Sequence, residues 1–134
     1  MKKHGVLNSH ISKVLADLGH TDYIVIGDIG LPVPDGIPKI DLALTYGVPS
    51  FEQVVDAIAA DMEVEKVVIA SEMVEQNPAA FQYMSQRFAE AEQQQCSHEQ
   101  FKQLTGGAKV VIRTGEAKPY ANCILQAGVY FGET

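Results

Sequence analysis

The spacing of apolar residues alternates between a helical and a strand-like pattern along the chain of 134 residues. Residues 7–18 place apolar side chains three or four positions apart, which predicts an amphipathic helix. Asn8 or Ser9 suits its N-cap, and Gly19 suits a left-handed C-terminal stop. Short apolar runs predict buried strands. These runs are 23–27, 40–44, 64–70, 109–114 and 123–131.

Three further helices carry start signals in the sequence. Two of them show the capping-box spacing of Ser and Gln three residues apart, and the third shows Asn followed by Pro. The predicted start residues are Ser50 for a helix through Met62, Asn77 for a helix beginning at Pro78, and Ser97 for a helix over 98–104. No repeat or linker divides the chain. We therefore predict one domain over residues 1–134, a three-layer α/β/α fold around a central, mostly parallel or mixed sheet.

Charge and composition exclude several classes of function. Hydrophobic residues make up 46% of the chain, and the formal net charge is −7. Arg87 and Arg113 are the only arginines, and no basic stripe appears in the sequence. Nucleic acids and anionic membranes require local positive charge, so we expect neither as a partner. No Gly-rich phosphate loop precedes a helix, and we expect no cofactor.

The cysteines and the N-terminus bear on metal binding and on location. Cys96 and Cys123 have no metal-ligand spacing, and no pair of His, Cys or carboxylate residues supplies one, so we predict no metal site. The opening MKKHGVLNSH has no apolar run long enough for a signal peptide, and no stretch of about 18 apolar residues occurs. We expect a cytoplasmic protein.

His20 and Asp28 are the first candidates for a polar site. Asp28 lies where the predicted strand 23–27 ends, and ligands of α/β proteins collect outside the carboxyl ends of strands. His20 follows a predicted helix C-terminus, whose carbonyl dipoles favour a protonated ring. We expect the two side chains to lie close together, with Asp28 orienting His20. The alternatives are a histidine that only satisfies helix carbonyls and an aspartate that only caps a turn.

The second half of the chain adds three candidates. His98 is the first residue of a predicted helix, where the positive end of the dipole favours a neutral ring. Tyr120 and Asn122 are two apart in a stretch predicted to be extended, so both side chains are expected on one side, as groups that bind sugar hydroxyls. The alternatives are an exposed residue at a helix start and an ordinary polar turn. His4 and His10 are expected on the surface.

Three separate segments resemble one known family over nearly the whole chain. They are MKKHGVLNSHISKVLADLGHTDYIVIGDIGLPVPDG, SHEQFK and IRTGEAKPYANCIL. These segments closely resemble the D-ribose pyranase family, the ribose mutarotases of bacterial ribose-uptake systems. The resemblance weakens mainly between Gln76 and Cys96.

The resemblance implies a cytoplasmic isomerase that interconverts the pyranose and furanose forms of ribose without metal or cofactor. It also implies a homo-oligomer, a decamer of two stacked pentamers, with sites at subunit contacts. By matching position, His20 is the expected proton donor, and the expected sugar-binding residues are Asp28, His98, Tyr120 and Asn122. The alternatives are a mutarotase for fucose or another monosaccharide, and a non-catalytic sugar-binding module. A sugar-phosphate isomerase would need a phosphate site that the sequence does not show.

Overall fold

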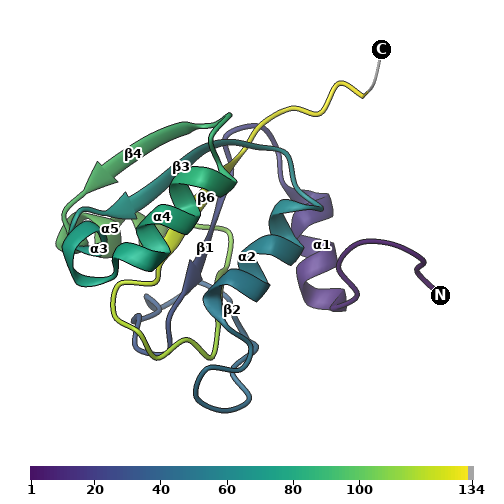
Figure 1. Ribbon diagram of the computed structural model, residues 1–134. Helices are drawn as coiled ribbons and strands as arrows, with labels where there is room; N and C mark the ends of the chain where they lie inside the picture. The colour runs from purple at the N-terminus through teal and green to yellow at the C-terminus, as the bar shows by residue number, and fades with distance from the viewer. Residues whose placement is uncertain (133–134) are drawn as a thin grey trace.

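A six-stranded mixed sheet forms the centre of the molecule (Figure 1). The computed structural model describes residues 1–132. In chain order the strands are β1 (Tyr23–Gly27), β2 (Lys39–Asp41), β3 (Val64–Ala70), β4 (Glu92–Cys96), β5 (Val111–Arg113) and β6 (Cys123–Ala127). They lie in the order β2-β5-β1-β6-β3-β4. Only β6 pairs antiparallel with its neighbours, β1 and β3, so the other five strands share one direction.

Helices cover both faces of this sheet. They are α1 (Ser9–Asp17), α2 (Phe51–Ala59), α3 (Glu72–Gln76), α4 (Pro78–Arg87) and α5 (His98–Leu104), followed by the 3-10 turn η1 (Thr105–Gly107). The larger apolar core joins one sheet face to α1, α2, α3 and α4. A smaller core joins the other face to Phe101 of α5 and to Leu31 in the loop after β1. The predicted α/β fold with a mixed sheet and helices on both sides is confirmed.

Local side-chain caps set the helix starts as the sequence predicts. Ser50 and Ser97 each accept a backbone N–H and form complete capping boxes with Gln53 and Gln100. Asn77 caps α4, with Pro78 in its first turn. Each cap satisfies backbone donors that the first helical turn leaves free, so these boundaries depend on nearby sequence alone.

Several boundaries differ from the prediction. Helix α1 ends at Asp17 with Leu18 in an extended conformation, and Gly19 has no left-handed backbone, so the predicted glycine stop is wrong. The left-handed residue of this turn is Thr21, with a φ of 75°. Helix α2 ends at Ala59 rather than Met62, and β6 ends at Ala127 rather than Phe131. The sequence also did not indicate α3 or the polar edge strand β4.

Candidate functional site

Four of the five predicted site residues lie at one edge of the sheet. Asp28 directly follows β1, and His98 opens α5 two residues after β4. Because β6 runs antiparallel to its neighbours, its first residue lies at the edge where β1, β3, β4 and β5 end. Asn122 therefore reaches the same edge immediately before β6, and Tyr120 lies in the loop that leads to it. These four residues are referred to below as the polar cluster.

Asn122 and Asp28 join the two central strands of the cluster. Asn122 is 1% exposed, and its side-chain Oδ1 accepts a hydrogen bond from the backbone N–H of Asp28 at 2.8 Å. Asp28 Oδ1 in turn accepts from the backbone N–H of Gly30 at 2.9 Å. The Asp28 carboxylate is thus held by a short turn of its own loop, while its backbone N–H is held by the side chain of Asn122 at the start of β6.

The surroundings of Asp28 disfavour the ionised form of its carboxyl group overall. Burial raises the pKa of this carboxyl above its usual value. Backbone N–H groups of Gly30 and Leu31, the amide of Asn122 and the nearby His98 offset that effect only in part. A carboxylate in this situation takes up a proton more readily than an exposed one, and a shift of this kind marks a residue as a candidate for a functional site.

His98 is held by its backbone and by two aromatic rings. Its N–H donates to both carboxylate oxygens of Glu72, each at 3.1 Å, which anchors the start of α5 to α3. The imidazole stacks on Phe101 and meets Tyr120 edge-on, with ring centroids 5.1 Å apart. Its Nδ1 is buried and has no hydrogen-bond partner among residues 1–132. Buried polar atoms normally have partners, so this unsatisfied nitrogen sets His98 apart from an ordinary helix-start residue.

Tyr120 reaches the cluster by a different backbone path from the predicted one. Its φ is 57°, in the left-handed region, and the N–H of Asn122 donates to its carbonyl at 2.9 Å. The segment is therefore a tight turn rather than an extended stretch, and the predicted reason for pairing Tyr120 with Asn122 is wrong. Each side chain instead joins the cluster through a contact of its own, Tyr120 with His98 and Asn122 with Asp28.

His20 lies at the opposite edge of the sheet. The N–H of Thr21 donates to the carbonyl of Ala127, at the far end of β6 from Asn122. Strand β1 separates His20 from Asp28, and five strand residues alone span about 13 Å. The expected contact between Asp28 and His20 within one chain is therefore wrong. The carboxylate beside His20 is Glu65, whose Oε2 lies 2.9 Å from Nε2 of the imidazole.

The electrostatic contrast predicted for the two histidines also needs correction. His20 lies three residues beyond the end of α1, where the field of the helix terminus has largely decayed, and it faces Glu65. His98 does open a helix, but the carboxylates of Glu72 and Asp28 oppose the helix dipole there. Each ring therefore has carboxylate neighbours, and helix position alone does not separate their roles.

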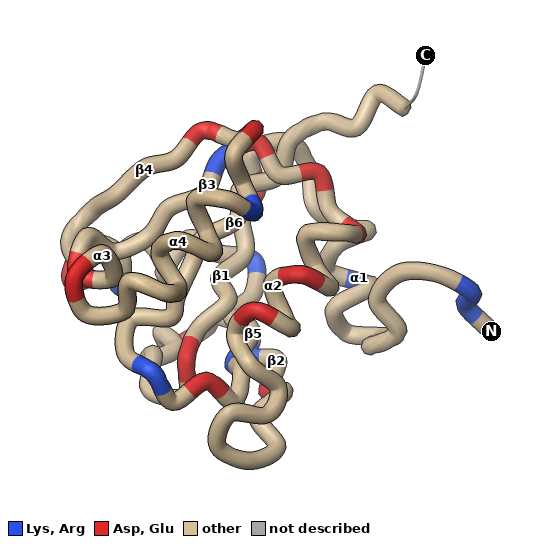
Figure 2. The backbone as a smooth tube through the Cα atoms, viewed as in Figure 1, with Lys and Arg blue, Asp and Glu red and all other residues tan. Residues whose placement is uncertain are grey.

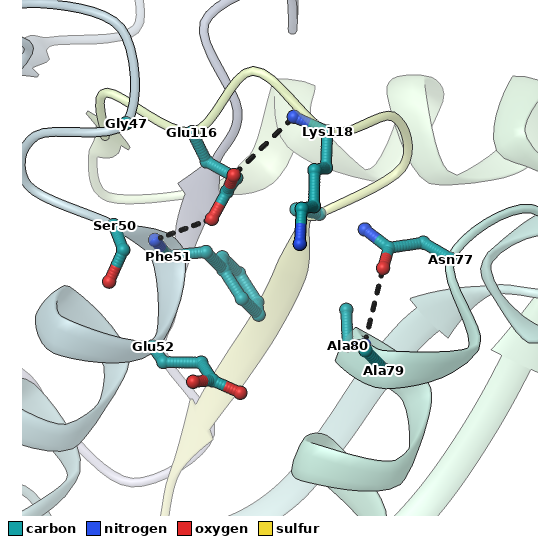
Figure 3. A pocket seen from close by; sticks show the side chains of 10 residues that line it. Gly47, Ser50, Phe51, Glu52, Asn77, Ala79, Ala80, Glu116 and Lys118 are labelled. Carbon is teal, nitrogen blue, oxygen red and sulfur yellow. Dashed lines mark hydrogen bonds between the residues drawn. The ribbon is translucent and has the colours of Figure 1, made fainter.

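A pocket of about 390 Å³ lies beside the polar cluster (Figure 3). The first turns of α2 and α4 line it, together with Glu116 and Lys118 from the loop before Tyr120. The Glu116 carboxylate accepts backbone N–H groups of Phe51 and Lys118, and so ties this loop to α2. None of the five predicted site residues lines this pocket. The Glu116 contacts in its wall hold the loop that carries Tyr120 and Asn122.

Other site classes find no support in the residues that the structure describes. Residues 1–132 hold no group of three or more His, Cys, Asp or Glu side chains placed to bind a metal ion. No helix in that range is long and apolar enough to cross a membrane. Lys and Arg appear as short, separate segments along the described backbone (Figure 2), whereas nucleic-acid recognition uses a basic track.

The structure is an α/β domain with a polar cluster at the carboxyl edge of its sheet, where proteins of this class bind small ligands, and the comparisons define it further. The RbsD / FucU transport protein family model matches residues 1–130, and the chain belongs to that family. It is 62% identical to the D-ribose pyranase of Bacillus velezensis over 131 residues, which is 98% of this chain and all of that protein.

Two solved structures place the fold within this family. The structure of Bacillus subtilis RbsD complexed with D-ribose has a TM-score of 0.96 and 58% identity, over 98% of this chain and all of that chain. The fucose mutarotase of Streptococcus pneumoniae, in complex with L-fucose, has a TM-score of 0.77 at 22% identity over 96% of this chain and 99% of that chain. The second likeness concerns the fold alone.

Proposed function

We propose that this protein is a D-ribose pyranase, which interconverts the pyranose and furanose forms of ribose. One observation carries the proposal. The chain shares 58% identity over 98% of its length with RbsD in complex with D-ribose, and its polar cluster of carboxylate, imidazole, phenol and amide groups at one sheet edge is consistent with that likeness. The named relatives at high identity are D-ribose pyranases, whereas the fucose mutarotase is only 22% identical.

The reaction needs proton transfer at two oxygens. Ring opening breaks the bond between the anomeric carbon and the ring oxygen, whose electron pair takes a proton from an acid. The anomeric hydroxyl loses its proton to a base and becomes the aldehyde carbonyl. Closure from a different hydroxyl reverses both transfers after the open chain has rotated. Positioned proton transfer contributes about 10²- to 10⁴-fold in rate, without metal or redox chemistry.

We assign His20 as the proton donor and Asp28, His98, Tyr120 and Asn122 as the sugar-binding residues. The imidazole of His98 and the half-buried Asp28 carboxylate are suited to hold or exchange protons with sugar hydroxyls. The phenol of Tyr120 and the amide of Asn122 are suited to hydroxyls that do not react.

A single chain keeps His20 and the polar cluster at opposite sheet edges, so the proposed site is completed by a second copy. Contact between the His20 edge of one subunit and the cluster edge of the next is head-to-tail, and such contacts form a ring where the rotation between neighbouring subunits closes. We therefore propose a ring-built homo-oligomer, a decamer of two pentamers, acting in the cytoplasm, with residues 1–134 as one domain. Exposed apolar side chains support association, namely Leu44 and Tyr46 in the loop after β2 and Tyr130 and Phe131 in the segment after β6.

The test of catalysis is NMR exchange spectroscopy on ribose, with and without catalytic amounts of protein. Acceleration of pyranose–furanose exchange supports the pyranase assignment. A non-catalytic sugar-binding module would bind ribose and leave the exchange rate unchanged, whereas a mutarotase for another sugar would accelerate exchange of fucose rather than ribose.

The test of a shared site is mixing two inactive variants. His20→Ala and His98→Ala, combined in equal amounts after subunit exchange, should recover about one quarter of wild-type activity, because about one site in four receives both intact residues. Exchange demonstrated by mass spectrometry without any recovery would refute a site shared between subunits.

A further inference from the structure

We propose that Glu65 and Gln126 form a clamp on His20 that holds Nε2–H of the imidazole, so that Nδ1 is the nitrogen that exchanges a proton with the sugar. This inference deepens the proposed function and rests on His20 as the proton donor. Glu65 acts here as a positioning residue: one carboxylate oxygen lies 2.9 Å from His20 Nε2, and the other accepts from Gln126 Nε2 at 3.0 Å. Both oxygens of the Glu65 carboxylate therefore have a fixed partner, which sets the orientation of the carboxylate toward His20.

An irregularity of the sheet places Glu65 in this position. Strand β3 pairs with β6 through Val64 with Ala127 and through Lys66 with Gln126, and the register shifts between these two pairs. Glu65 is the extra residue of that shift. A β-bulge re-aims side chains, and bulges are common beside active sites. Without it, Glu65 and Lys66 would point to opposite faces of the sheet, whereas here Glu65 reaches across to Gln126 and to His20 beyond it.

The segment that carries His20 is also held in place. The turn from Gly19 to Asp22 is closed by the Asp22 carboxylate, which accepts the N–H of Gly19 at 2.8 Å. Backbone bonds of Thr21 and Asp22 with Ala127 attach the turn to the end of β6. Thr21 has a φ of 75°, in the left-handed region that a β-branched residue rarely adopts. Such a backbone persists only where its surroundings enforce it, and it commonly occurs at functional sites.

The charge state of Glu65 determines which nitrogen carries the hydrogen. Its hydrogen bond with Gln126, followed by that with His20, lowers the pKa of the carboxyl below its usual value, and Lys66 adds to this effect. An ionised carboxylate only accepts hydrogen bonds, so Nε2 must be the donor. In the neutral ring, Nδ1 is then the basic nitrogen.

The clamp therefore gives His20 a defined role in the reaction. The protonated ring transfers the Nδ1 hydrogen to the ring oxygen as the anomeric C–O bond breaks and its electron pair moves to that oxygen. The neutral ring keeps Nε2–H on Glu65, and Nδ1 takes the proton back when the hydroxyl attacks the aldehyde. A fixed tautomer avoids the ring flip that a free histidine would need before each turnover.

The experiment combines the tautomer of His20 with ribose exchange kinetics. Protein labelled with ¹⁵N-histidine reports the tautomer of each neutral ring, and a His20→Ala sample identifies the signal of His20. We expect Nε2–H in the wild type. In Glu65→Ala we expect a mixture of tautomers and a kcat about 10-fold lower, with little change in KM. Glu65→Gln keeps a side-chain acceptor, so it should restore Nε2–H and much of kcat.

A neighbouring acid provides the matched control. Glu63 is exposed and lies two residues before Glu65, and Glu63→Ala removes a negative charge of the same strand region without touching the clamp. It should change neither the tautomer nor kcat, whereas Gln126→Ala should change both in the direction of Glu65→Ala. Nδ1–H in the wild-type ring, or a shifted tautomer with unchanged kcat in Glu65→Ala, would overturn the inference. Absence of ribose exchange by the wild type would instead reject the proposed function, and the tautomer signals would still decide whether the clamp exists.

Discussion

Replacing Asn122 with alanine should damage both the stability of the fold and the proposed sugar site. The side chain is 1% exposed, and its Oδ1 is the partner of the Asp28 backbone N–H at 2.8 Å. Alanine leaves that N–H without its acceptor, a loss of about 2 kcal/mol of unfolding free energy. The unfolding entropy is about 2.1 cal/mol/K per residue, or about 0.3 kcal/mol/K for 134 residues. The thermal midpoint should therefore fall by about 7 °C.

The same substitution removes an amide that favours the ionised form of Asp28, so the pKa of that carboxyl should rise further. A hydrogen bond to a charged group is worth about 1.5–3 kcal/mol, so we expect ribose exchange to slow by about 10- to 100-fold. The assays are calorimetry and exchange NMR at one fixed protein concentration, because oligomers unfold in a concentration-dependent way.

Ile58→Val is the control for instability alone. Ile58 is 1% exposed on the buried face of α2, away from the polar cluster, and removing one methyl group there costs about 1 kcal/mol of unfolding free energy. This variant should melt about 4 °C lower with an unchanged exchange rate. If Asn122→Ala melted within about 2 °C of the wild type, or retained full activity, Asn122 would not couple β6 to Asp28 as argued.

Three further outcomes are expected. Burial raises the pKa of Asp28, so the folded state binds this proton more tightly than the unfolded state, and the stability it contributes is lost as pH rises through the folded pKa. Urea unfolding of Asp28→Asn at several pH values should lack that loss, and the variant should not accelerate ribose exchange. Thr21→Gly should raise the thermal midpoint, because glycine adopts a φ of 75° without strain; an unchanged or lower midpoint would contradict the strain at this turn. Exchange activity should survive EDTA and need no nucleotide, and activity restored by a metal after EDTA treatment would reject the metal-free mechanism.

Local sequence determined the elements whose signals lie within a few residues of one another. The capping boxes at Ser50 and Ser97 and the Asn–Pro start at Asn77 act through contacts between near neighbours in the chain. Strands β1 and β3 have continuous apolar runs because helices cover both faces of the sheet, so side chains on either face are buried. These features were sufficient to predict an α/β fold.

Elements at the margin of the sheet left weaker signals. Strand β4 reads EQQQC, and most of its side chains are exposed, so no hydrophobic alternation marks it. It is a strand because its backbone pairs with β3, and a pairing partner distant in the chain is invisible to local pattern. The five-residue helix α3 is likewise too short to show a helical period.

The arrangement of the candidate site depended on the tertiary structure. Sequence singled out His20, Asp28, His98, Tyr120 and Asn122 as polar candidates, but proximity along the chain wrongly suggested that His20 and Asp28 meet. A strand carries its two flanking residues to opposite edges of a sheet, and the reversed direction of β6 brings Asn122 to Asp28 from far along the chain. The partner of His20 depends on a register shift in β3, and no local pattern in VEKVVIA shows that Glu65 turns toward it.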